Sequence, residues 1–368
     1  MRLALSNHGL RASGGIERYA LTVVRGLHAL GLRPTVIAKA FDTKLPEYGW
    51  VEPLRVNVAW LPAKLRDLAF DRRIRVLKRK FGLFPLIACN QTAAADIAIC
   101  GSTHPGFLQA MAQRERLSDR WKIALEHAHL TNASVIVAHS QRMADEVQRF
   151  HGIATDKIRL LYPPVDGERF ATVDGAARLR LRAELGLAAE GRTAFLLAST
   201  GHRRKGLDML VEFFRATTLP VDLVVAGRPL PAEASAPNIR SLGYRRDIEN
   251  VYRAVDFTIM ASRYEPFGLV GVESVLCGTP VLCAHGVGCA EVLHLPAQIP
   301  FRLDAGAGDA DGFAAAVAEA VERHESGTHR LDEPRAHLGY DPSVSHHVNE
   351  LLSMARSLDE RRSAQSGR

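Results

Sequence analysis

One stretch near the C-terminal third of the sequence constrains the fold most, because a strand pattern gives way to a helix pattern within a few residues. Residues 257–261 form an apolar run that is typical of a buried parallel strand. Pro266 and Gly268 interrupt this run, and Leu269 and Val272 then open a helical period. A strand, a tight loop and a helix in this order predict one unit of an α/β protein with a parallel sheet. In such folds, ligands bind beyond the carboxyl ends of the strands.

Two carboxylates belong to this stretch, with seven residues between them. Glu265 falls in the predicted loop, and Glu273 falls about two turns into the predicted helix. The backbone of residues 267–270 is a candidate phosphate seat, because free N–H groups and the helix dipole favour an anion at a helix N-terminus. The two acids could hold hydroxyl groups at two places along one extended ligand. A loop acid and an unrelated solvated helix acid are the alternative.

The length of 368 residues predicts two domains. A hydrophobic fraction of 47% and a charged fraction of 24% exclude a disordered chain. Pro163 and Pro164 are consecutive and cannot continue a sheet, so they predict the boundary. We expect domains at residues 1–163 and 164–342. Residues 343–368 are expected to form a helix that crosses back to the first domain, followed by a frayed tail.

Several classes of protein are disfavoured by the composition. No apolar run approaches the roughly 20 residues that span a bilayer, so a cytoplasmic location is expected. The five cysteines lack metal-binding or disulfide-framework spacing and indicate core residues. The formal charge of +7 favours an acidic partner, which could be nucleotide phosphate, nucleic acid or an anionic membrane.

The segment that begins at Lys64 and ends at Phe81 concentrates positive charge. It holds eight cationic and two acidic side chains, a net charge of +6. Phe70, Ile74 and Leu77, together with Phe81, share one face at helical spacing. Such a helix suits an anionic membrane surface, and an ordinary domain helix with a solvated basic back fits the pattern equally well. Nucleic acid is disfavoured, because no aromatic side chains interleave the cations.

Two other loops have chemistry suited to phosphate. Gly14 and Gly15 follow the first predicted strand and precede a helix, where glycine lets the backbone approach a ligand closely. They do not form the Gly-x-Gly-x-x-Gly fingerprint, so a dehydrogenase loses support. Arg204 and Lys205 stand just before Gly206, between the strand at residues 194–198 and the helix at residues 207–216. Their charges at a strand end could neutralise a diphosphate.

Single residues at other strand ends are weaker candidates. His104 follows a strand at residues 96–100 in a loop flanked by glycines, where it could touch substrate. A structural role for a lone histidine is the alternative. Arg228 and Tyr244 follow two strands of the second half and could lie beside a base or a ribose.

Together these motifs resemble the family 4 glycosyltransferases of GT-B fold, and among them most closely the lipopolysaccharide core glucosyltransferases. The resemblance covers nearly the whole chain. It implies two Rossmann-like domains that face a central cleft, with the acceptor bound by the first domain and a nucleotide sugar bound by the second. The motifs that carry it are Gly14-Gly15-Ile16-Glu17, Arg204-Lys205-Gly206, Gly227, Gly243, the pair Glu265 and Glu273, and Gly278-Thr279-Pro280-Val281.

The resemblance also implies an activity. It is the retaining transfer of a hexose from a nucleotide-diphosphate sugar, expected to be a UDP-sugar, to a glycolipid, lipopolysaccharide core or oligosaccharide acceptor. No metal ion or other cofactor is implied, and the enzyme would work at the inner membrane as a cytoplasmic, peripheral protein. The alternatives are another GT-B activity, such as a sugar-nucleotide epimerase or a glucan synthase, and a catalytically silent protein that binds sugar nucleotides.

Residue roles follow from the same resemblance. Lys205 and Arg204 would hold the diphosphate, Glu265 would meet the donor sugar and His104 would lie near the transferred sugar; these four form the implied catalytic set. Glu273 would bind the ribose, so the two glutamates would not flank the scissile bond about 5 Å apart as in retaining glycosidases. We therefore expect front-face substitution, in which the leaving phosphate takes the acceptor proton. The implied donor-binding residues are Gly14, Gly15, Gly201, Arg228, Tyr244, Phe267, Gly268, Leu269, Val270 and Glu273.

Overall fold

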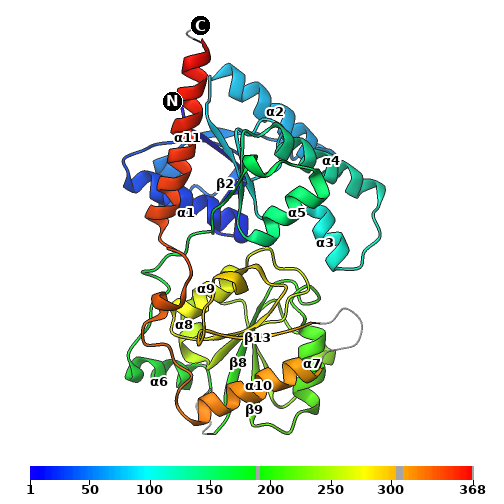
Figure 1. Cartoon of the computed structure of the whole chain (residues 1–368), viewed down its shortest axis with the longest axis vertical. Helices are drawn as coiled ribbons and strands as arrows, with labels where there is room; N and C mark the ends of the chain where they lie inside the picture. Colours follow the sequence, from blue (N-terminus) through cyan, green and yellow to red (C-terminus); the bar gives the residue numbers. More distant parts are fainter. Residues whose placement is uncertain (188–190, 304–309, 367–368) are drawn as a thin grey trace. The chain divides into compact units, whose positions relative to one another are not determined.

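The computed structural model describes residues 1–187, 191–303 and 310–366 (Figure 1). The chain forms two compact units. The first unit contains Met1–Pro164 together with the segment from Pro342 onward, and the second contains Val165–Asp341. Each unit has a parallel sheet with helices packed on it, which confirms the prediction of two Rossmann-like α/β domains. None of the described helices has the length and apolarity that a bilayer span requires.

A seven-stranded sheet forms the centre of the first unit, and all of its neighbouring strands are parallel. Ala4 of β1 lies opposite Thr35 of β2 on one side and Leu86 of β4 on the other. The strand order therefore reverses between β1 and β4, which is where open α/β sheets bind ligands. In spatial order the strands are β3 (Glu52–Arg55), β2 (Thr35–Phe41), β1 (Ala4–Leu10), β4 (Leu86–Ala88), β5 (Ile97–Cys100), β6 (Val135–Ala138) and β7 (Ile158–Leu160).

In the described part of the first unit, six α-helices and three short 3₁₀ helices accompany this sheet. They are α1 (Gly15–Ala29), α2 (Arg66–Lys80), α3 (His104–Ala110), α4 (Leu117–Asn132), α5 (Gln141–His151), α11 (Val344–Ser366), η1 (Pro46–Trp50), η2 (Ala63–Leu65) and η3 (Thr155–Lys157).

The C-terminal helix α11 belongs to the first unit, as predicted (Figure 1). Its apolar side chains join the core cluster that contains α1. Gly26 of α1 makes close packing possible, since a Cβ atom there would lie 2.5 Å from Cγ2 of Val348. Nε2 of His347 also lies 2.8 Å from the Tyr19 hydroxyl. These contacts fix the returning helix to the first unit.

The segment that contains α2 packs on the first unit, as the alternative of an ordinary domain helix expects. Before the helix, β3 ends at Arg55, and Asn57 accepts a hydrogen bond from the Ala59 N–H in a turn. The predicted apolar face of α2 is used inside the unit. Phe70 and Ile74 are fully buried in a core cluster, so this face is not available to a membrane.

The second unit has a six-stranded sheet whose neighbouring strands are also parallel. The chain runs from β8 outward to β10 and then returns to β11 on the other side of β8. The loops that follow β8 and β11 therefore start at the point where the strand order reverses. In spatial order the strands are β10 (Ile239–Gly243), β9 (Val221–Gly227), β8 (Thr193–Ser199), β11 (Phe257–Met260), β12 (Val281–Ala284) and β13 (Gln298–Phe301).

Two helices of the second unit begin at the residues that the sequence predicted, Leu207 and Leu269. The helix of the opening stretch starts at Leu269, directly after the predicted loop. Residues 288–292 form the 3₁₀ helix η5. The helices are α6 (Gly175–Glu184), α7 (Leu207–Ala216), α8 (Ile248–Ala254), α9 (Leu269–Leu276), α10 (Ala310–Glu325), η4 (Ala232–Ala234), η5 (Gly288–Val292) and η6 (Pro334–His337).

Candidate active site

The loops that follow β8 and β11 are bound to each other. The Arg263 N–H donates to the Arg204 carbonyl oxygen at 2.9 Å, and Nη1 of Arg204 donates to the Tyr264 carbonyl oxygen at 2.8 Å. Gly206 has φ = +76°, and a Cβ atom there would overlap the carbonyl oxygen of Ala261. Glycine is therefore required at this position, and the Arg-Lys-Gly motif is held against the end of β11.

A carboxylate and two cations form the centre of the site. Oε2 of Glu265 lies 2.5 Å from Nζ of Lys205 and 2.7 Å from Nη1 of Arg204, and it accepts a hydrogen bond from the Ser262 hydroxyl at 3.3 Å. The side chains of Lys205 and Glu265 are only 9% and 13% exposed. The Lys205 backbone N–H donates to the Gly201 carbonyl oxygen at 3.0 Å, which closes the turn before the motif. The sequence identified these residues but did not predict that they pair.

The charges in this cluster control the ionisation of Glu265. Burial opposes ionisation of the carboxyl group, but the positive charges of Lys205 and Arg204 outweigh burial and hold the pKa of Glu265 below its ordinary value. Glu265 is therefore a carboxylate at neutral pH. It cancels one of the two cationic charges, so the three side chains together have a net charge of +1.

The loop between β11 and α9 leaves a helix N-terminus open beside this cluster. Gly268 precedes the helix with φ = +95°, and no side chain caps its N-terminus. The first N–H groups of a helix have no partner within that helix, so the backbone of residues 268–270 presents donors for an anion. Two backbone hydrogen bonds from η5 hold this loop. The Gly288 N–H donates to the Glu265 carbonyl oxygen at 3.0 Å, and the Cys289 N–H donates to the Phe267 carbonyl oxygen at 2.6 Å.

Glu273 has different partners from Glu265. It lies on α9 with its side chain buried, and its Oε2 accepts a hydrogen bond from the Tyr252 hydroxyl at 3.0 Å. A buried carboxylate is costly unless it accepts hydrogen bonds, and the Tyr252 hydroxyl donates one such bond. The two glutamates of the sequence motif are thus held by separate elements.

Two predicted contacts to the base lie at the ends of neighbouring strands. Arg228 and Tyr244 are both exposed, and Tyr244 retains 66% of its accessible surface. The sequence did not single out His202, which connects the end of β8 with the loop that follows β9. Its Nδ1 lies 2.9 Å from the Ser199 hydroxyl and its Nε2 lies 3.0 Å from the Pro229 carbonyl oxygen.

The remaining predicted site residues belong to the first unit. Gly14 and Gly15 stand at the start of α1, where no side chain caps the helix. A Cβ atom on Gly15 would meet no atom within 4 Å, so packing within the structure does not require glycine there. His104 is not in a loop as predicted but is the first residue of α3, because Thr103 caps that helix by accepting a hydrogen bond from the Gly106 N–H.

Family models match both units of the chain. A model described as Glycosyltransferase Family 4 matches residues 13–169, and one described as Glycosyl transferases group 1 matches residues 192–323. A probable transglycosylase of Burkholderia thailandensis is 45% identical over 358 residues, which are 96% of this chain and 97% of that protein. This chain belongs to the family 4, group 1 glycosyltransferases.

A further relative is similar in sequence, and two solved structures of other proteins share the fold of this chain. The mannosylfructose-phosphate synthase of Agrobacterium fabrum is 23% identical, and the match covers 76% of this chain and 73% of that protein. The crystal structure of WaaG, a glycosyltransferase involved in lipopolysaccharide biosynthesis, has a TM-score of 0.75 at 15% identity and covers 94% of this chain and 95% of its own. The Anabaena HepE structure in complex with UDP and glucose has a TM-score of 0.72 at 18% identity, with coverages of 96% and 99%.

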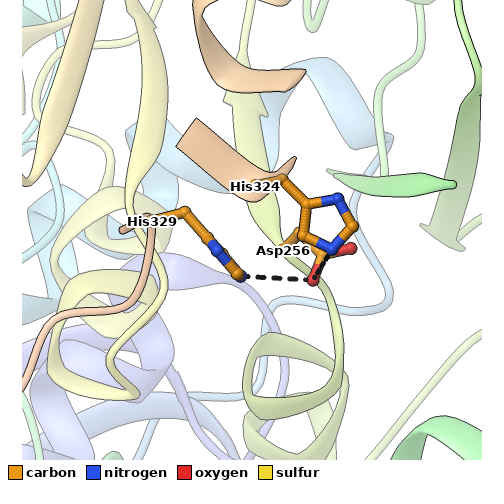
Figure 2. A group of neighbouring side chains, drawn as sticks. All are labelled: Asp256, His324 and His329. Carbon is orange, nitrogen blue, oxygen red and sulfur yellow. Dashed lines mark ion pairs between the residues drawn. The ribbon is translucent and has the colours of Figure 1, made fainter. Parts of the chain in front are cut away.

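Among the described residues of this glycosyltransferase, one group of side chains could hold a metal ion. It is formed by Asp256, His324 and His329 (Figure 2). Nε2 of His329 lies 3.4 Å from Oδ1 of Asp256, and Nε2 of His324 lies 3.7 Å from it. The same oxygen is already paired with Arg178 at 2.5 Å and Arg182 at 2.9 Å, so a divalent cation would have to displace two guanidinium groups. Burial opposes ionisation of Asp256, but His329 and Arg182 outweigh it and hold its pKa well below the ordinary value.

The position of this cluster also separates it from the site described above. Asp256 directly precedes β11, whereas Glu265 follows that strand, so the two lie at opposite edges of the sheet. Oδ2 of Asp256 accepts a hydrogen bond from the Ala194 N–H of β8 at 2.8 Å, and Nη1 of Arg182 in α6 donates to the Ala254 carbonyl oxygen at 2.8 Å. We assign the cluster to holding α6 and α10 against the sheet.

Proposed function

We propose that this glycosyltransferase transfers a hexose, with retention of configuration, from a UDP-sugar to a glycolipid or lipopolysaccharide core acceptor. The observation that carries the proposal is the cluster of Arg204, Lys205 and Glu265 beside the open N-terminus of α9, at the point where the strand order reverses. A nucleoside diphosphate is the ligand that uses both features at once. The neighbour solved with UDP and glucose and the neighbour involved in lipopolysaccharide biosynthesis support the donor and the acceptor.

The cations act on the charge that develops during transfer. As the bond between the anomeric carbon and the phosphate oxygen breaks, negative charge grows on the diphosphate. Lys205, Arg204 and the N–H groups at the start of α9 are already in place and stabilise this charge without reorganisation. Glu265 holds the cations in position before the donor arrives, and the diphosphate then competes with it for them. In this proposal Glu265 also meets the donor sugar.

The partners of the two glutamates favour front-face substitution over double displacement as the route to the proposed retention. A double-displacement mechanism needs a carboxylate free to attack the anomeric carbon. Glu265 is paired with two cations, and Glu273 accepts a hydrogen bond from Tyr252 and is assigned to the ribose. In front-face substitution the acceptor oxygen attacks from the side the diphosphate leaves, and the acceptor proton passes to a phosphate oxygen. No group of the protein is then required as a nucleophile.

The rest of the donor extends from this centre. Glu273 binds the ribose hydroxyls, and the exposed ring of Tyr244 and the guanidinium of Arg228 border the base. In the first unit, Gly14 and Gly15 approach the diphosphate, and His104 lies near the transferred sugar. Since protein cations neutralise the phosphates, we propose that transfer proceeds without a metal ion, and turnover in the presence of a chelator tests this.

The lipid character of the acceptor implies an anionic membrane surface, and we propose that the exposed side of α2 contacts it at the cytoplasmic face of the inner membrane. Exposed cations cover this side, and Trp60, Leu65 and Leu68 are exposed beside them, with Trp60 at 76%. Flotation with anionic liposomes should retain the wild type and lose a variant in which four cations become serine, and equal flotation of the two would refute the contact. Lys78 is left unchanged because it pairs with Asp96 at 2.7 Å. The four substitutions are Arg72→Ser, Arg73→Ser, Arg79→Ser and Lys80→Ser.

The experiment that tests the proposed function measures transfer and hydrolysis by the purified protein with UDP-, GDP- and ADP-sugars and a panel of glycolipid and oligosaccharide acceptors. Lys205→Ala should abolish most of the transfer. Arg192→Ala is the matched control, because it also removes a cation of the second unit but one that pairs with Asp222. A protein that binds donor without turnover would indicate a silent binding protein. Conversion of the donor sugar without an acceptor would indicate an epimerase, and extension of a glucan would indicate a glucan synthase.

A further inference from the structure

His104 is held from two directions by carboxylates of α4. Its backbone N–H lies 2.9 Å from Oε2 and 3.1 Å from Oε1 of Glu126, and its Nε2 lies 2.9 Å from Oδ1 of Asp119. The side chains of Glu126 and Asp119 are 3% and 10% exposed, whereas that of His104 keeps 18% of its surface. Two nearly buried acids therefore fix a histidine whose ring still reaches solvent.

The Asp119 carboxylate is itself immobilised. Its Oδ2 accepts a hydrogen bond from the Arg116 N–H at 3.0 Å at the start of α4. Its Oδ1 faces His104 and lies 3.3 Å from Nζ of Lys122. The hydrogen bond from His104 is the largest of the causes that lower the pKa of Asp119 to about 2. At neutral pH Asp119 is ionised and can only accept hydrogen bonds.

Glu126 fixes the backbone of the same residue. Its Oε1 lies 2.8 Å from Nε2 of His151 on α5, and its Oε2 accepts a hydrogen bond from the side chain of Gln91 at 3.0 Å. One carboxylate thus connects the start of α3, the body of α4 and the end of α5. The position of the His104 ring is set through its main chain as well as through its side chain.

We propose that Asp119 is a positioning residue that holds His104 as the tautomer with the proton on Nε2, so that Nδ1 accepts a hydrogen bond from a hydroxyl group of the transferred sugar. The tautomer follows from the chemistry, because an acceptor-only carboxylate at Nε2 requires a proton on that nitrogen. The role rests on the proposed function, in which His104 lies near the donor sugar. With a donor that lacks the hydroxyl facing Nδ1, His104 should then make no contribution to kcat/KM.

The tautomer can be measured without any turnover. Nitrogen NMR of the histidine rings in the wild type should show His104 protonated on Nε2 and unprotonated on Nδ1 near neutral pH. In Asp119→Asn the amide can either accept from Nε2 or donate to it, so the tautomers should mix or invert. A wild-type ring that carries its proton on Nδ1 would overturn the proposal.

Kinetics then separate positioning from helix capping. Asp119→Asn should lower kcat/KM about ten- to hundredfold, the usual range for the loss of a carboxylate that orients a functional histidine. Asp174→Asn is the matched control, since Asp174 caps α6 through the Ala177 N–H and contacts no histidine in the described structure. Its kcat/KM should remain that of the wild type. Equal losses in the two variants would assign Asp119 to capping alone.

A double-mutant cycle decides whether Asp119 acts through His104. In a His104→Ala background, Asp119→Asn should cause no further loss of kcat/KM, because the group it orients is gone. The same further loss in both backgrounds would overturn the proposal. If the wild type transfers no sugar from any donor, the proposed function fails, while the NMR result still tests the tautomer. If the wild type is active and Asp119→Asn equals it, the positioning role alone is wrong.

Discussion

Replacing Lys205 by alanine should damage both the chemistry and the stability of the second unit. Nζ of Lys205 lies 2.5 Å from Oε2 of Glu265, and both side chains are nearly buried. Removing one preorganised group that stabilises the leaving charge costs about 10²–10³-fold in kcat. Removing one partner of a buried pair costs roughly 3–5 kcal/mol of stability, and we expect the lower end, about 3 kcal/mol, because Arg204 still pairs with Glu265 at 2.7 Å.

The stability loss has a defined dependence on pH. The pKa of Glu265 is depressed in the folded protein, so its pairing stabilises the protein above the ordinary value of 4.5 and is lost as the pH falls through the folded pKa. Lys205→Ala raises that folded pKa, because one of the two cations is gone. The difference in unfolding free energy between wild type and variant should therefore narrow as the pH falls through the depressed pKa of Glu265, which urea unfolding at several pH values measures.

A second substitution separates the two effects. In Lys205→Ala with Glu265→Gln, no buried carboxylate loses its partner, so most of the stability should return while transfer stays low. Transfer should be measured with saturating donor, so that weaker binding does not hide the effect on kcat. The reasoning is refuted if Lys205→Ala keeps wild-type kcat, or if the double variant recovers activity together with stability.

Three shorter predictions concern neighbouring residues. Gly206→Ala should lose about 2 kcal/mol or more of stability in urea unfolding, because φ is +76° and the new methyl group overlaps the Ala261 carbonyl oxygen; wild-type stability would contradict this. Asp256→Asn should destabilise the second unit by about 3 kcal/mol at neutral pH by leaving two arginines unpaired, and Zn²⁺ should not raise the melting temperature of the wild type. A higher melting temperature in the presence of Zn²⁺ would indicate that the cluster binds a metal ion. Glu273→Gln should weaken nucleotide binding about tenfold in calorimetry, and unchanged affinity would remove Glu273 from the ribose site.

Local signals in the sequence predicted much of the second unit. Residues 207–216 were predicted as a helix with the bounds that α7 has. The apolar pattern of this helix begins directly after Gly206, which ends the loop before it. The start of α9 could also be predicted from the sequence, because Pro266 and Gly268 exclude a continued strand.

Features that depend on contacts between residues far apart in the chain could not be predicted from the sequence. Lys205 and Glu265 are 60 residues apart, and only the adjacency of β8 and β11 brings them together. The sequence likewise gave no sign that Asp119 would meet His104. The amphipathic pattern of α2 was real, but periodicity alone does not say whether a core or a membrane covers the apolar face, and Phe70 is buried in the core. The three-residue strand β4 is too short to give a pattern.

The central claim is that Arg204, Lys205 and the start of α9 bind the diphosphate of a nucleotide sugar. Calorimetric titration of wild type and Lys205→Ala with a nucleoside diphosphate and its monophosphate tests it most directly. The base is chosen as the one that gives the largest thermal shift. We predict that the diphosphate binds the wild type at least tenfold more tightly than the monophosphate, and that this ratio falls towards one in the variant. The same ratio in both proteins would contradict the account.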